Sequence, residues 1–207
     1  MPDPKYTKPW HGVPREQILW HPTVSAQTKT ITLKDLIKFH GHFCGGLVEG
    51  ATTLRVAFDR LFPEGVIDRT DLRIASNNSA CGGDVAAYLS GTRTRFGSHY
   101  IDPALKEGEF LVQRLSTQET VRVGIDAATY PHDVRAQMRK IESGTFTSPD
   151  LDSFQDLQWE YARKLVNRPP EESVDMAQDT GCVWPDPPCK DMGERRDNLY
   201  KGVAPTQ

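Results

Sequence analysis

The chain has 207 residues, a formal net charge of −3 at pH 7 and a pI near 6.1. This length allows one domain with extensions, large enough for a hydrophobic core that needs no disulfide bonds. The charge balance argues against nucleic acid as a partner, and no apolar run approaches the roughly 20 residues that span a bilayer. The N-terminus also lacks an apolar signal segment, so we expect a cytoplasmic protein that binds neither nucleic acid nor membrane.

The two ends of the chain differ in composition from its middle. Residues 1–30 are rich in Pro, Trp and His and hold neither helical nor strand periodicity, which predicts an extended N-terminal arm. Residues 31–167 carry the periodic segments and are predicted to form the folded domain. Residues 168–207 are polar and rich in proline, which predicts a C-terminal tail.

Two helices are predicted at the start of the folded domain. Thr32 and Asp35 form a pattern close to a capping box, and the helix that they begin is predicted to end at Gly41. The second helix is predicted over residues 45–62, where apolar residues recur at helical spacing until Pro63 interrupts them.

The rest of the domain is predicted to contain a strand, a helix, a hairpin and two further helices. In chain order these elements are expected at residues 71–76, 84–89, 110–115, 120–125, 131–141 and 148–165. Ser148 with Pro149 is predicted to begin the last helix, as cap and first helical residue. Because strands and helices do not alternate regularly, this order predicts an α+β fold, with a small mixed or antiparallel sheet covered by helices.

Two loops that run into predicted helices carry the residues of chemical interest. The first places His40, His42 and Cys44 within five residues, interrupted by glycine. The second is a polar loop that leads into Cys81 and a Gly-Gly pair. The positive end of a helix dipole and unpaired backbone N–H groups favour a thiolate, which is the form that binds metal or attacks electrophiles.

One nitrogen and one sulfur ligand are a pairing that zinc accepts readily. His40 and Cys44 share a face if the helix continues, whereas His42 and Cys44 can chelate from an extended turn. Cys81 or Asp84 could complete a three-ligand set and leave a fourth position for water or substrate. Each residue also has an ordinary interpretation. His40 could be a core histidine, and Cys44 could be a small buried hydrophobe. Cys81 could belong to a packed helix start, and Asp84 could be a first-turn acid that complements the helix dipole.

Other polar residues are weaker candidates. Asn77, Asn78 and Arg93 are predicted to contact a cofactor or an anionic substrate, although an exposed loop arginine is more often simply solvated. Cys182 and Cys189 are not spaced as a C-x-x-C pair, so a loop disulfide, a second metal site and two idle thiols all stay open.

The stretch Phe39-His40-Gly41-His42-Phe43-Cys44-Gly45-Gly46 resembles the signature of the FmdE (FwdE) family of formylmethanofuran dehydrogenase subunits, with glycine where proline is usual. Cys81-Gly82-Gly83-Asp84-Val85 is similar to the Cys-x-x-Asp-Ala motif of the same family. The resemblance covers roughly residues 32 to 165. It implies an α+β fold, often dimeric, with a bound metal, commonly zinc, whose ligands come from His40, His42, Cys44 and Cys81.

These observations lead to one main functional hypothesis and two alternatives. The main one is a zinc-type, thiolate-containing domain that acts on or carries a small molecule in one-carbon, sulfur or redox metabolism, with Cys44 and His42 as its catalytic residues. The first alternative is a non-enzymatic accessory or metal-handling subunit of a redox complex. The second is a haem- or flavin-binding module, which an absorption spectrum would reveal.

Overall fold

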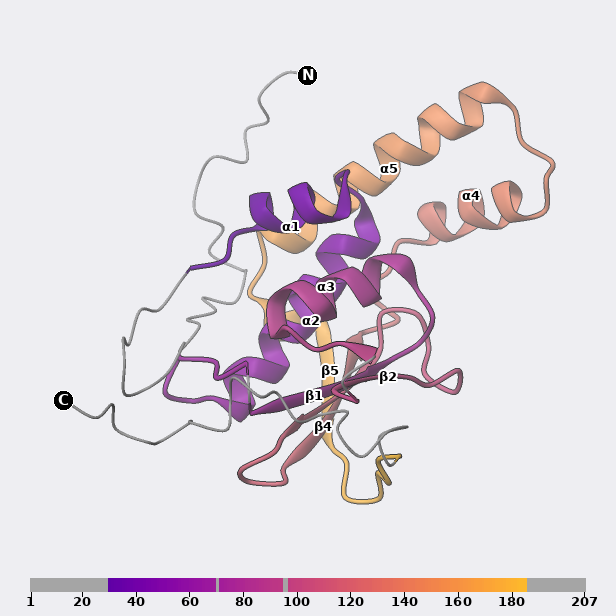
Figure 1. Ribbon diagram of the computed structural model, residues 1–207. Helices are drawn as coiled ribbons and strands as arrows, with labels where there is room; N and C mark the ends of the chain where they lie inside the picture. The colour runs from indigo at the N-terminus through magenta and orange to yellow at the C-terminus, as the bar shows by residue number, and fades with distance from the viewer. Residues whose placement is uncertain (1–29, 70, 95–96, 186–207) are drawn as a thin grey trace.

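The computed structural model describes residues 30–69, 71–94 and 97–185 (Figure 1). Nearly all of the predicted N-terminal arm therefore lies outside the described residues, as does Cys189. The described part contains five α-helices and one five-stranded sheet, and Figure 1 shows the helices gathered on one side of that sheet. In these ranges no helix has both the length and the apolar character that crossing a membrane requires.

The sheet is mixed, as the order of elements predicts. Its strands lie in the order β2-β1-β3-β4-β5. Only the β1–β2 pair is parallel, and the other neighbours are antiparallel. The bounds are Leu72–Ser76 for β1, His99–Ile101 for β2, Phe110–Arg114 for β3, Thr120–Ile125 for β4 and Val174–Gln178 for β5.

The first two helices form as the sequence predicts. α1 (Leu33–His40) begins at a complete capping box, in which the Thr32 hydroxyl accepts from the Asp35 backbone and the Asp35 carboxylate accepts from the Thr32 backbone. It ends at Gly41, whose φ of 94° is a left-handed conformation that glycine adopts at little cost. α2 (Gly45–Leu61) is buried along most of its length and packs on α3, α5 and the sheet.

α3 (Ala80–Ser90) begins earlier than the sequence predicts. Its cap is Ser79, whose hydroxyl accepts from the Gly82 backbone, so both glycines lie inside the helix and Cys81 lies in its first turn. A Cβ at position 82 would lie 3.5 Å from the Phe110 ring on β3, which is an ordinary van der Waals contact, and a Cβ at position 83 would meet nothing within 4 Å. The Gly-Gly pair therefore lies within the first turn of the helix and does not end a loop.

α4 (His132–Glu142) and α5 (Ser148–Val166) form a hairpin that projects from the rest of the molecule in Figure 1. The cap of α5 is Thr147, one residue before the predicted one, and its backbone N–H donates to Asp150 at 2.7 Å. Only the second half of α5 is buried, through Tyr161, Ala162 and Leu165.

Two strands, β2 and β5, are not predicted by the sequence pattern. β2 has three residues, which are too few to show an alternating pattern. β5 follows a short 3₁₀ turn, Pro170–Glu172, in the segment expected to be tail, and it pairs with β4. Only its first residue, Val174, is buried, so the strand carries almost no hydrophobic signal.

The described cysteines fall into two separate packing groups. Cys44 and Cys81 belong to the main core between the helices and the sheet. Cys182 packs instead with Ala75, Leu105 and Leu111, in a smaller cluster that also contains Trp184. None of the three described cysteines forms a disulfide with another.

Candidate metal centre

Cys44 is the N-cap residue of α2. The turn at Gly41 reverses the chain after α1, and the extended backbone at Cys44 points its side chain at the first turn of α2. There the sulfur accepts from the Leu47 backbone N–H at 3.4 Å. The thiol therefore occupies the position where serine or aspartate usually caps a helix and where a negative charge is favoured.

Cys81 reaches the same place from the first turn of α3. Its Sγ lies 3.5 Å from the Sγ of Cys44. Gly46 makes this approach possible, because a Cβ at position 46 would lie 3.1 Å from both the Cβ and the Sγ of Cys81. The glycine at position 46 is thus explained by the proximity of the second cysteine.

His40, the last residue of α1, completes the group. Its Nε2 lies 3.7 Å from Cys44 Sγ and 3.6 Å from Cys81 Sγ. Its Nδ1 lies 2.8 Å from a carboxylate oxygen of Asp84, and its side chain is only 5% exposed. A carboxylate that holds one imidazole nitrogen and turns the other towards a metal is the usual outer contact of metal-binding histidines.

The three ligand atoms form a triangle with sides of 3.5, 3.6 and 3.7 Å. In a tetrahedral zinc site, bond lengths of about 2.3 Å to sulfur and 2.0 Å to nitrogen separate the ligand atoms by about 3.5 to 3.8 Å. The triangle therefore has the dimensions of one face of such a tetrahedron. The residues present fit a zinc-type ion without rearrangement of the backbone.

His42 lies at the exposed edge of this group. The ligand atoms of His40, His42 and Cys44 all lie within 4.8 Å of one another, and the two imidazole rings are 4.5 Å apart between centroids. His42 is thus placed either to supply a further ligand or to act on a molecule that occupies the open side of the site.

The two thiols differ in their protonation behaviour. The hydrogen bond from Cys81, helped by backbone N–H groups, lowers the pKa of Cys44 to about 7 in spite of its burial. The same hydrogen bond, together with burial, raises the pKa of Cys81. Once the pair has lost one proton, the remaining proton stays on Cys81, which donates it in a hydrogen bond to the Cys44 thiolate. Cys44 is therefore the sulfur that ionises first, and it does so near neutral pH.

The other predicted site residues are less close to the thiols. Asn77 and Asn78 lie in the loop between β1 and the α3 cap, on the side from which Cys81 enters the site. Arg93 follows the other end of α3, beyond the C-cap Gly91. Ten residues of helix separate the two ends by about 15 Å, so the structure does not bring Arg93 to the cysteine pair.

Two residues, Asp84 and Glu49, have surroundings in the structure that their sequence context does not indicate. Asp84 fits a first-turn acid in sequence, whereas its carboxylate contacts His40 in the structure. Glu49 is a charged residue within the apolar face of α2, and that interruption is the one signal by which the sequence could have revealed it. In the structure Glu49 is 9% exposed.

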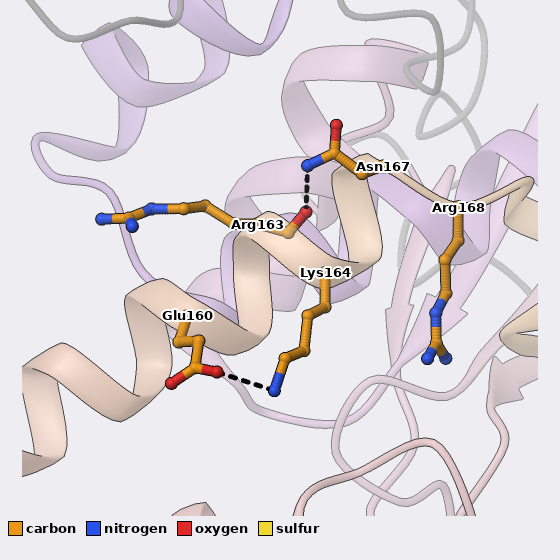
Figure 2. Close-up of a pocket in the computed structure, with 5 residues that line it drawn as sticks. All are labelled: Glu160, Arg163, Lys164, Asn167 and Arg168. Carbon is orange, nitrogen blue, oxygen red and sulfur yellow. Dashed lines mark hydrogen bonds and ion pairs between the residues drawn. The ribbon is translucent and has the colours of Figure 1, made fainter.

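A second surface feature lies on α5. Figure 2 shows an open depression lined by Glu160, Arg163, Lys164, Asn167 and Arg168. Lys164 pairs with Glu160 at 2.8 Å, and the Asn167 side chain donates to the Arg163 carbonyl at 2.8 Å. The depression has no cysteine or histidine among its lining residues.

Comparison with known proteins identifies the family. Residues 39–175 match the sequence model of the family described as "FmdE, Molybdenum formylmethanofuran dehydrogenase operon". This chain belongs to the FmdE family. The match includes both cysteine loops and extends into β5, so it covers the whole centre described above.

A solved structure is also similar to this FmdE-family chain. One similar solved structure is a tungsten formylmethanofuran dehydrogenase FmdE-like protein from Syntrophus aciditrophicus. It is 18% identical in sequence, with 76% of this chain and 74% of that chain covered and a TM-score of 0.48. No curated protein matches the chain.

Proposed function

We propose that this FmdE-family chain is a zinc-type metal-binding domain in which His40, Cys44 and Cys81 hold the metal. The observation that carries the proposal is the triangle of ligand atoms, whose sides fit one face of a tetrahedral site. His42 provides the fourth contact or serves as a base at the open side. The domain acts on, or carries, a small molecule in one-carbon, sulfur or redox metabolism.

Each group in the centre has a separate task. Asp84 orients His40, and the two helix N-termini stabilise the negative charge of the thiolates. A zinc ion bound there would supply Lewis acidity and an open coordination position. In the absence of metal, Cys44 is the nucleophile, because its thiolate forms near neutral pH.

Elemental analysis together with a visible spectrum tests this function. We expect the purified chain to contain about one zinc-type ion and no coloured cofactor. Replacement by cobalt should give the visible and near-ultraviolet bands of a thiolate-bound, tetrahedral ion. Haem, flavin or an iron–sulfur cluster would instead colour the protein as isolated, and such a spectrum would replace the zinc proposal with the cofactor-binding alternative.

The surroundings of the centre favour a second, accessory role. Phe39 and Trp159 are 51% and 42% exposed, and they pack against Tyr88 and Phe43 beside the cysteine loops. Exposed aromatic side chains of this kind are typical of protein–protein contacts. The family description names an operon of a redox enzyme, which supports a redox complex as a partner. We propose that this edge also mediates a homodimer.

Light scattering tests the dimer. We expect a mass about twice that of the 23.2 kDa chain, and a mass close to one chain for the double variant Phe39→Gln/Trp159→Gln. Phe146→Gln is the matched control, because Phe146 is also exposed but lies at the turn between α4 and α5. A monomeric wild-type chain at every concentration, or dimers in the double variant, would contradict the proposal.

A further inference from the structure

We propose that the face of the sheet turned away from the helices carries a binding site for a small oxyanion, a carboxylate or a phosphate, which Arg73, Trp184 and Tyr100 form. Three observations carry the inference. They are a half-buried guanidinium without a carboxylate partner, a buried indole N–H without an acceptor, and a segment of chain that encloses both. The site is separate from the metal centre, so the inference goes beyond the proposed function and does not depend on it.

The alternation of side chains along β1 places the site on the face that the helices leave uncovered (Figure 1). Ile74 belongs to the main core beneath the helices, whereas its neighbour Ala75 belongs to the smaller cluster that contains Trp184. Arg73 is the other neighbour of Ile74, so its side chain lies on the same face as that of Ala75. Tyr100 pairs with Ala75 across the β1–β2 ladder and belongs to the same cluster.

Residues 179–185 cross this face as a strap. At its start Asp179 accepts from Arg122 of β4 at 3.3 Å. Near its end the Trp184 ring packs edge-on against Tyr100 of β2, with 5.5 Å between centroids. The strap therefore spans the sheet from β4 to β2 and lies over β3 and β1 between them. Polar groups that β1 presents on this face are enclosed between the sheet and the strap.

Arg73 is a half-buried cation with no opposite charge beside it. Its guanidinium carbon lies 4.5 Å from the centroid of the Trp184 ring, so the indole covers one side of the group. Its Nε donates to Gln113 Oε1 at 2.6 Å, and no carboxylate of the described residues lies within ion-pair distance of its nitrogens. Burial lowers the pKa of Arg73, because the charged form loses water without gaining an anion. The donors of its two terminal nitrogens are the fork that binds carboxylate and phosphate oxygens.

Trp184 supplies a second donor without an acceptor. Its Nε1–H is buried and has no hydrogen-bond partner within the part of the chain that the structure describes. Nearly all buried polar groups in folded proteins are bonded, so such a group indicates a partner that is still to be supplied. The indole is stacked on the guanidinium, and an oxyanion has several acceptor oxygens. One ion can therefore accept from both groups, with the Tyr100 hydroxyl as a third donor.

The charges on this face indicate that the ligand is an anion. Arg122 has the same orientation on the sheet but is already neutralised, by Glu109 at 3.1 Å and Asp179 at 3.3 Å. Arg73 has no such partner among the described residues, so a neutral or cationic ligand would leave its charge uncompensated. The strap leaves little room above Arg73, which limits the ligand to a small ion or to the anionic end group of a larger molecule.

Two-dimensional ¹H–¹⁵N NMR of the full chain tests the inference, because the indole N–H of each tryptophan gives its own signal. Loss of one signal in Trp184→Phe identifies that of Trp184. Inorganic phosphate and acetate are titrated separately, with chloride keeping the ionic strength constant. We expect at least one of the two ions to shift the Trp184 signal saturably while the Trp159 signal stays fixed, and the comparison of the two identifies the preferred oxyanion. Arg73→Gln should weaken binding by at least about tenfold.

Arg60→Gln is the matched control, because it removes an exposed arginine that pairs with Glu119 elsewhere on the surface and changes the net charge equally. It should bind the ion as wild type does. Trp184→Phe keeps a stacked ring without the N–H, and calorimetry should show several-fold weaker binding. The NMR spectra also verify that each variant is folded. The inference is overturned if neither ion gives a saturable shift, if Arg73→Gln binds as wild type does, or if Arg60→Gln weakens binding equally.

Discussion

Replacement of Cys44 by serine is expected to weaken the binding of zinc or cobalt by at least about 100-fold. In the proposed centre Cys44 is one of the two sulfur ligands, and its thiolate forms near neutral pH, whereas a serine hydroxyl stays protonated and binds zinc poorly. The hydroxyl can still accept from the Leu47 backbone as a helix cap, so the fold should survive. Competition with a coloured zinc chelator measures the affinity.

Two further variants make this a graded series. Asp84→Asn keeps the shape of the side chain but removes the charge that orients His40, so a loss of about 10- to 100-fold is expected. Cys182→Ser should leave the affinity unchanged, because that thiol packs in the smaller cluster with Ala75 and Leu111. If Cys44→Ser retained wild-type affinity, the ion would have to be held elsewhere and the proposed centre would be wrong.

The sequence predicts most of the elements whose signals are local. The capping box at Thr32, the turn at Gly41 and the apolar stripe of α2 depend on residues a few positions apart, and the structure confirms each of them. The α+β class and the mixed sheet are also confirmed, since they follow from the order of these elements. β5 escapes prediction because its stability comes from pairing with β4, and its own side chains are mostly exposed.

The site is predictable in its composition but not in its geometry. Two cysteine loops at helix starts indicate a shared centre, and the structure brings Cys44 and Cys81 to 3.5 Å. The partners of His40 cannot be deduced, because the contact with Asp84 spans 44 residues and depends on how α1 crosses α3. In the sequence Glu49 is marked only by its place within the apolar face of α2, and its three-dimensional surroundings establish that it is buried.

Glu49 also makes the stability of the metal-free protein depend on pH. Its pKa is about 7 in the folded chain, against an ordinary value of 4.5, mainly because burial disfavours the carboxylate. A raised pKa means that folded protein binds the proton more tightly than unfolded protein does. The contribution of Glu49 is therefore complete below about pH 4.5 and is lost as the pH rises through about 7.

Substitution of Glu49 by glutamine should remove this dependence, because the amide stays neutral at every pH. A shift from 4.5 to about 7 corresponds to about 3 kcal/mol in the free energy of unfolding. Relative to wild type, Glu49→Gln should gain that amount between about pH 4.5 and pH 8, as measured by urea unfolding of reduced, metal-free protein. The difference between the two proteins cancels the other ionisations, including that of Cys44, apart from its coupling to Glu49.

Glu171→Gln is the control, because it removes an exposed acid, and its difference from wild type should not change with pH. A constant difference for Glu49→Gln as well would mean that Glu49 titrates in the folded protein as it does in the unfolded chain, and its burial would then carry no energetic cost. A gain that appears with rising pH would show that the protein keeps a destabilising acid beside its cysteine pair. Such a result would also show that ionisation of the buried carboxylate costs free energy in the folded protein, which is why an amide that stays neutral at every pH is better tolerated there.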